Sequence, residues 1–154
     1  MIDLAHVHPM LVHFPIVLFL LGAALELLVL IRRGDLAARQ CLASTALAVM
    51  LLAALAAIAT AFFGDVALDR AAELGFPRAP LERHGDLGFS TMWFLIAYAA
   101  LYLLAWWRRF PLAAGRGWAW FVVSLAGVAL VLVTAYFGGD LVYQIGVNVA
   151  PVHP

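Results

Sequence analysis

The sequence predicts an all-α integral membrane protein, a bundle of four transmembrane helices that forms a single domain over residues 1–154. Composition is the first observation behind this prediction, because 66% of the residues are hydrophobic, 12% are charged, and the mean hydropathy is +1.02. A soluble domain is far less apolar. The second observation is four apolar stretches of about 20 residues, the length that crosses a bilayer. We expect these spans at residues 11–31, 42–63, 87–107 and 118–137.

The charged residues and the single cysteine exclude several classes of protein. Nine basic residues, all of them arginine, balance nine acidic ones, so no excess of positive charge is present to hold nucleic acid. Cys41 is the only cysteine, which excludes an internal disulfide, a covalent haem attachment motif and a cysteine-ligated iron–sulfur cluster. Any metal in this protein would have nitrogen or oxygen ligands.

The arginines predict the orientation of the spans. The first and third connections are short and carry Arg32, Arg33, Arg39, Arg108, Arg109 and Arg116, whereas a longer charged loop between the second and third spans carries Arg70, Arg78 and Arg83. Short loops rich in basic residues stay in the cytoplasm. We therefore expect both termini, and the middle loop, on the outer side of the membrane.

The chain contains a candidate internal duplication. Residues 8–33 align without a gap on residues 84–109, which matches His8 with His84 and both Arg-Arg pairs. The second spans of the two halves end alike, in Thr-Ala-Phe-Phe-Gly at 60–64 and Thr-Ala-Tyr-Phe-Gly at 134–138. These matches predict two tandem two-helix repeats, about 8–65 and 84–140, related by a pseudo-two-fold axis along the membrane normal. A site on that axis would receive one ligand from each half.

Histidines gather on the predicted outer side, and they are the candidate ligands of a metal or a cofactor: His6, His8, His13, His84 and His153. Symmetry favours His8 as the partner of His84. Depth favours His13, which we expect inside the apolar packing, where an ionisable residue indicates function. A second ring nitrogen needs a hydrogen-bond acceptor, for which Asp65, Asp86 and Asp140 are candidates. The alternative is that these side chains are interfacial and bind nothing.

Aromatic residues at the outer helix ends favour haem over a bare metal. We expect Phe63, Trp93 and Phe137 to enclose a cofactor, although interfacial anchoring explains such a belt equally well. The cytoplasmic half has no histidine, so a haem would sit toward the outside. Glu26 is the only acidic residue within a span; we expect it to snorkel or to pair with Tyr102 or an arginine, with a proton relay as the alternative.

The opening string His-Pro-Met-Leu-Val-His-Phe-Pro at 8–15 and the closing string Phe-Gly-Gly-Asp-Leu-Val-Tyr at 137–143 resemble the signatures of the bacterial domain-of-unknown-function family 2231. The resemblance runs from about His8 to Val147 and implies a bacterial inner-membrane protein. A histidine of the family's closing motif is absent here, where Gln144 follows Tyr143, so His153 or Asp140 would have to replace it. Some members resemble fusions to Rieske-type domains, which implies electron transfer on the outer face.

The leading hypothesis from the sequence is that the protein is a b-type cytochrome. It would hold haem b between His8 or His13 and His84 and exchange electrons with a periplasmic redox protein. A second hypothesis is a Zn or Cu site built from three of the five histidines and an aspartate. A third is a structural accessory subunit of a membrane complex. All three describe a protein in contact with the lipid bilayer, and they favour a non-catalytic electron-transfer or binding protein over an enzyme. The sequence leaves homo-oligomer formation open.

Overall fold

A computed structural model describes residues 6–149, and within that range the chain is helical with no strand. Its helices are α1 (Val7–Leu11), α2 (His13–Ile31), α3 (Cys41–Glu73), α4 (Arg78–Arg108) and α5 (Ala114–Tyr143). The single residue between α1 and α2 keeps helical backbone angles, so these two helices form one rod. The four resulting rods are each long and apolar enough to cross a membrane. The prediction of four spanning helices is confirmed.

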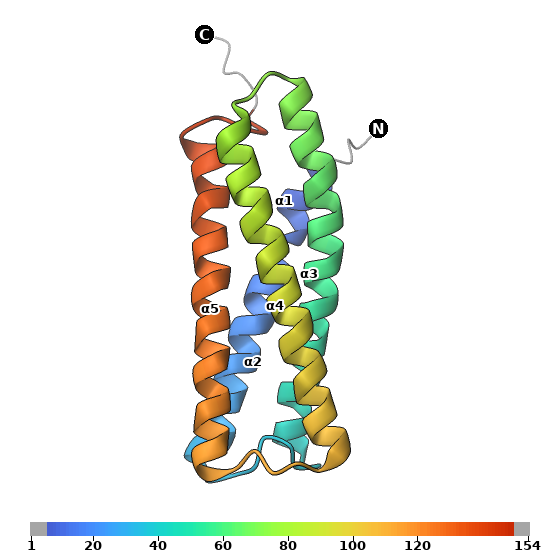
Figure 1. Ribbon diagram of the computed structural model, residues 1–154, viewed down its shortest axis with the longest axis vertical. Helices are drawn as coiled ribbons and strands as arrows, with labels where there is room; N and C mark the ends of the chain where they lie inside the picture. Colours follow the sequence, from blue (N-terminus) through green and yellow to red (C-terminus); the bar gives the residue numbers. More distant parts are fainter. Residues whose placement is uncertain (1–5, 150–154) are drawn as a thin grey trace.

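The four rods form an up-and-down bundle (Figure 1). Each long helix packs against two neighbours, so that α2 and α4 both contact α3 and α5. The α3–α4 turn, the start of α1 and the end of α5 lie at one end of the bundle (Figure 1), which we call the histidine end. The turns over residues 32–40 and 109–113 lie at the other, which we call the arginine end.

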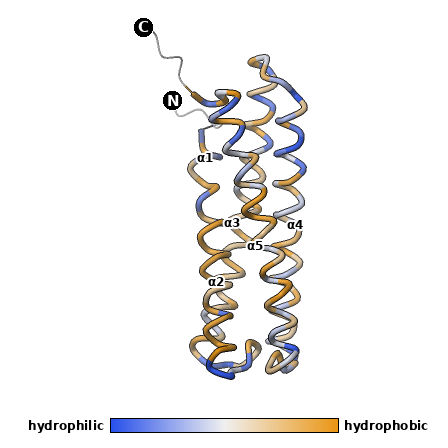
Figure 2. Tube along the Cα trace, turned by 90° about the vertical axis from the view of Figure 1, so that its left-hand side faces the viewer, coloured by the Kyte–Doolittle hydropathy of each residue, from blue (hydrophilic) through white to orange (hydrophobic). Residues whose placement is uncertain are grey.

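The long helices extend further than their apolar segments. A charged loop was expected over residues 64–86, but α3 continues to Glu73 and α4 begins at Arg78, so the turn is only residues 74–77. The hydropathy signal of a span ends with its apolar residues. The helix itself continues, because alanine and charged residues are compatible with helical structure. With 33 residues, α3 is about 50 Å long and exceeds the hydrocarbon layer of about 30 Å. Hydrophilic residues gather along this extension (Figure 2).

Both Arg-Arg pairs end a helix in the same way. Arg33 and Arg109 have φ values of 54° and 53°, the left-handed conformation that commonly terminates a helix and that usually belongs to glycine. These two arginines are the aligned residues of the candidate repeats. The same local geometry therefore closes the first and third spans.

The arginine end is closed by contacts between its two turns. Oδ1 of Asp35 accepts hydrogen bonds from the backbone N–H groups of Ala37 and Leu112, both at 2.9 Å. Leu36 is fully buried, and its carbonyl accepts a hydrogen bond of 3.2 Å from the hydroxyl of Tyr102, which is also fully buried. Large side chains thus fill the bundle at this end.

Glu26 does not have the environment expected from the sequence. Its side chain is 0% exposed, so it does not snorkel. Its hydrogen-bond partner is the hydroxyl of Tyr98, 2.7 Å from Oε1, whereas the sequence suggested Tyr102 or an arginine. Tyr98 lies one helical turn before Tyr102 on α4, and that turn brings its hydroxyl to the carboxyl group.

A small second core lies at the histidine end. Ala71, Leu81 and Leu141 are buried there, and Leu68 and Val147 pack against them. These residues come from α3, α4, α5 and the segment after α5. They connect the extensions of α3 and α4 to the last residues that the structure describes. They also line the cavity described next, on its side away from the arginine end.

Candidate cofactor site

His8 is held from α1 against the backbone of α3. Its Nδ1 lies 2.9 Å from the carbonyl oxygen of Thr60. A carbonyl oxygen only accepts, so Nδ1 carries the proton in this contact. The neutral ring then keeps its lone pair on Nε2, which is the state in which imidazole binds a metal.

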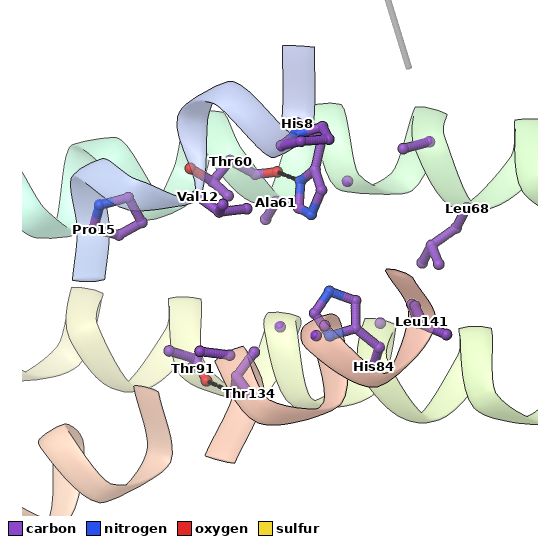
Figure 3. A pocket seen from close by; sticks show the side chains of 18 of the residues that line it. His8, Val12, Pro15, Thr60, Ala61, Leu68, His84, Thr91, Thr134 and Leu141 are labelled. Atoms are coloured by element: carbon purple, nitrogen blue, oxygen red, sulfur yellow. Dashed lines mark hydrogen bonds between the residues drawn. The ribbon is translucent and has the colours of Figure 1, made fainter. Parts of the chain in front are cut away.

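His84 faces His8 from α4 on the opposite side of the bundle. The two ring centroids are 6.1 Å apart, and the ring planes make an angle of 75°. In Figure 3 one nitrogen of each ring points toward the other ring. Nδ1 of His84 is buried beside the carbonyl of Thr134, although it makes no hydrogen bond of regular geometry. Each histidine therefore directs one nitrogen to a threonine carbonyl and the other to the space between them.

Two glycines let the histidine rings lie against the next helix. A Cβ atom on Gly64 would come within 3.0 Å of Cε1 and Nδ1 of His8, and one on Gly138 within 2.9 Å of Cε1 of His84. Such distances are shorter than ordinary van der Waals contact, so any larger residue would displace the ring. Gly64 and Gly138 are aligned residues of the candidate repeats, four positions after Thr60 and Thr134.

Threonine hydroxyls hold the backbone beside each histidine. Oγ1 of Thr60 donates to the carbonyl of Leu11 at 3.4 Å. That carbonyl has no helical partner, because the residue four positions later is Pro15, which has no N–H. In the second half, Oγ1 of Thr134 lies 3.4 Å from the carbonyl oxygen of Leu87. Leu87 aligns with Leu11, so the two halves share this contact, although the Thr134 hydroxyl lies nearer to the carbonyl oxygen of Leu130, at 2.9 Å, and to Oγ1 of Thr91, at 2.7 Å.

The histidines open onto one cavity of about 490 Å³, a size typical of ligand pockets. All the long helices contribute to its wall, mostly with glycine, alanine and aliphatic side chains, including Val12, Leu68 and Leu141 (Figure 3). Polar groups in the wall include the two histidines together with Thr60 and Thr134. An apolar pocket with a few convergent polar groups is the usual form of a ligand site.

The other predicted histidine ligands are placed differently. His13 lines the cavity but is exposed, so the expectation that it is buried in the helix packing is wrong. Its position five residues after His8 turns it toward another face of the rod. His6 is also exposed, and His153 lies outside the described residues. Of the two candidates on the first rod, His8 is the one that faces His84.

Backbone carbonyls occupy the positions predicted for aspartates. Asp65 and Asp86 are exposed and Asp140 is partly buried. The acceptor at Nδ1 of His8 is Thr60, where the sequence suggested a carboxylate. Threonine was noticed in the sequence only as part of the repeated Thr-Ala-aromatic-Phe-Gly motif, and a backbone carbonyl leaves no sequence signal of its own.

The three aromatic residues expected to enclose a cofactor do not line the cavity, where the aromatic residues are Phe89 and Tyr143. Phe63, Trp93 and Phe137 are not among its lining residues. Trp93 is 64% exposed, and the ring of Phe137 lies 5.2 Å below the guanidinium of Arg83. Helical spacing turns these rings outward, where they fit the alternative of interfacial anchoring.

The described residues contain no group of three or more histidine, cysteine, aspartate or glutamate side chains that could hold a metal ion. A bare Zn or Cu site of the kind considered from the sequence needs at least three such ligands. His8 and His84 therefore face each other as two imidazoles, without a third side chain of these types grouped with them in residues 6–149.

A comparison with protein-family models matches residues 5–151 to DUF2231, which is described as a predicted membrane protein. Neither the curated proteins nor the solved structures compared with the chain include a match. The family match covers nearly the whole chain, from before the first histidine of the facing pair to beyond the end of α5. The chain belongs to the DUF2231 family of predicted membrane proteins.

Proposed function

We propose that this protein binds one haem b between His8 and His84 and carries electrons at the histidine end of the bundle. The observation that carries the proposal is the pair of imidazole rings that face each other across an apolar cavity, with centroids 6.1 Å apart. The protein would act as an electron carrier and not as an enzyme.

The separation of the rings suits a shared metal. A metal bound between two imidazoles lies about 2 Å from each nitrogen, and each ring centroid lies somewhat further back. A centroid separation of 6.1 Å leaves room for one metal ion between the rings. Two protein ligands are enough for haem, because the porphyrin provides the other four. A bare metal ion would lack ligands here, which favours haem over Zn or Cu.

The residues of the cavity prepare the histidines for this role. A bound haem would supply one-electron redox chemistry. The carbonyl of Thr60 fixes the His8 tautomer with Nε2 free. Gly64 and Gly138 allow the rings to lie close to the helices, and the mostly apolar wall would suit the faces of a porphyrin.

We also propose that the two histidines belong to tandem repeats, about 8–65 and 84–140, related by a pseudo-two-fold axis. The matching contacts support this relation: each half places a histidine against a glycine and a threonine hydroxyl beside an aligned leucine carbonyl. The matching left-handed residues Arg33 and Arg109 support it independently. A single ligand on the axis would take one bond from each repeat.

The positive-inside rule places the arginine end in the cytoplasm. The histidine end then faces the periplasm of a bacterium, with the protein in the inner membrane. We propose a periplasmic redox protein as the electron partner, because the charged helix extensions at this end project beyond the hydrocarbon layer.

The test is an absorption spectrum of the detergent-purified protein, from haem-replete cells, before and after reduction with dithionite. We expect a Soret band and a sharp α band on reduction, with about one haem per chain in a pyridine haemochromogen assay. His8→Ala and His84→Ala should each remove or strongly shift these bands, since each deletes one axial ligand. His13→Ala is the matched control and should keep the spectrum, because His13 is exposed and outside the facing pair.

Colourless protein that takes up no haemin on titration would contradict the proposal, as would an unchanged spectrum in His84→Ala. Stoichiometric Zn or Cu without haem, by elemental analysis, would favour the metal-ion hypothesis instead. The side of the membrane can be read from Cys41, which is exposed near the arginine end. A membrane-impermeant maleimide should label it in inverted vesicles and leave it unlabelled in spheroplasts.

A further inference from the structure

A second polar site lies inside the bundle, away from the histidines. Glu26 is fully buried, and the hydroxyl of Tyr98 donates a hydrogen bond of 2.7 Å to its Oε1. The other carboxyl oxygen, Oε2, is buried with no partner in the described part of the chain. Ser124 of α5 lies beside both Glu26 and Tyr98, and its hydroxyl is likewise buried and unpaired.

The surroundings of Glu26 contain no positive charge to balance a carboxylate. The titratable groups that face it are the tyrosines of α4, Tyr98 and Tyr102, and α5 contributes Ser124. The indole of Trp120 packs 5.0 Å from the ring of Tyr98. Within residues 6–149 the one ion pair joins Arg70 to Glu73, near the histidine end. A carboxylate without a balancing charge is strongly unfavourable in the interior of a membrane bundle.

We propose that Glu26 is a buried proton-binding site, a neutral carboxylic acid held between Tyr98 and Ser124. In this state Oε1 is the carbonyl oxygen that accepts from Tyr98. Oε2 keeps the proton and, after a small rotation of either side chain, donates a hydrogen bond to the hydroxyl oxygen of Ser124, so both atoms that are unpaired in the structure gain a partner. The proton neutralises the carboxylate of Glu26, for which the surrounding side chains offer no positive charge.

A proton fits this site better than a metal cation does. Divalent cations such as Mg²⁺ and Ca²⁺ take six or more oxygen ligands. The side chains here offer the oxygens of one carboxyl group and of the Tyr98 and Ser124 hydroxyls. No second acidic residue is present at this depth, because Glu26 is the only acid within the apolar part of any span.

The site is separate from the facing histidines, so this proposal does not depend on haem. Glu26 lies 18 residues after His8 on one rod, which corresponds to about 27 Å of helical rise. A chain without haem could still hold the proton, and a haem protein could still have an ionised Glu26. The two proposals therefore fail independently.

Infrared spectroscopy of the whole protein in lipid nanodiscs tests the proposal. At neutral pH the difference between wild type and Glu26→Gln should contain the C=O stretching band of a protonated carboxylic acid, and the band should shift to lower frequency in D₂O. Tyr98→Phe should move the band to higher frequency, because the hydrogen bond to the C=O group is lost. Glu73→Gln is the control: Glu73 is exposed and paired with Arg70, so its difference spectrum should show only carboxylate bands.

Isotope labelling keeps the test valid if Glu26→Gln does not fold. The chain has only three glutamates, and Glu73 and Glu82 are both exposed. A carboxylic C=O band that shifts on ¹³C-glutamate labelling of the wild type would thus come from Glu26. If labelling moves only carboxylate bands at neutral pH, the proposal is overturned.

Discussion

The two ends of the bundle are built in opposite ways. At the arginine end, fully buried Leu36 and Tyr102 fill the space between the helices, and Asp35 ties the two turns together. At the histidine end, glycines and small side chains leave a cavity of about 490 Å³ whose wall includes His8 and His84. A protein interior is normally packed without such space. The difference is one of packing: the same four rods are filled by large side chains at one end and leave open space at the other.

The contrast is sharper because the ends belong to the same helices. In α4, Tyr102 lies at the filled end and His84 at the hollow end. Buried polar atoms without a hydrogen-bond partner occur at both ends, namely Nδ1 of His84 at the hollow end and the indole nitrogens of Trp106 and Trp120 toward the filled end. The two ends therefore differ in packing and not in how completely their polar groups are paired.

Removing the side chain of Tyr102 should have the largest effect on stability. Tyr102→Ala deletes a fully buried ring and should lower the free energy of unfolding by about 3–5 kcal/mol. Tyr102→Phe keeps the ring and loses only the hydrogen bond to Leu36, which costs about 1 kcal/mol. Denaturant unfolding in detergent measures both values. If the two variants lose the same stability, the ring does not hold the arginine end together.

At the histidine end, one added methyl group should separate stability from binding. The Cβ of Gly64→Ala would lie 3.0 Å from the His8 ring, whereas the Cβ of Gly88→Ala would meet nothing within 4 Å, although Gly88 also lines the cavity. We expect Gly64→Ala to weaken haem affinity at least tenfold, or about 1.4 kcal/mol, by displacing the ring. Both variants replace glycine in a helix, which favours folding by about 0.5–1 kcal/mol.

Haem titration and thermal unfolding, performed on both glycine variants, give the comparison. Gly88→Ala adds its methyl group to the cavity wall without touching either histidine, so it should weaken haem binding less than Gly64→Ala does. Equal affinity in Gly64→Ala and the wild type would show that the position of the His8 ring is not critical, and it would weaken the case for His8 as an axial ligand.

Much of the fold could be predicted from the sequence, because membrane spans are a matter of apolar length. The four spans were correct, but the helix ends near Glu73 and Arg78 were missed, since a helix that leaves the bilayer carries no hydropathy signal. The choice between His8 and His13 depended on the direction of each side chain around the rod. The depth of His13 along the helix favoured that residue, but the side chain that faces His84 is that of His8.

The environment of each candidate residue was harder to predict than its position. The predicted hydrogen-bond partner of Glu26 lies one helical turn away from the observed one. The repeat alignment pairs Glu26 with Tyr102, whereas the packing of α4 brings Tyr98 to the carboxyl group. The roles of Thr60 and Gly64 depend on a backbone carbonyl and on missing volume. A search of the sequence for reactive or metal-binding side chains detects neither a backbone carbonyl nor a missing side chain. Both residues nevertheless belong to the repeated motif.

The smallest effect should come from relieving strain at the filled end. Arg109 has a φ of 53° and ends α4, a conformation that is unfavourable for any residue with a Cβ. Arg109→Gly should raise the free energy of unfolding by up to about 1 kcal/mol. Arg108→Gly, one residue earlier in the helical conformation, should instead lower it by about 1 kcal/mol. Chemical denaturation of the two variants measures the difference. Arg108 also lies over the ring of Trp107, with its guanidinium carbon 5.7 Å from the ring centroid, so the decisive result is the gain in Arg109→Gly, and a loss there would mean that the Arg109 side chain itself supports the arginine end.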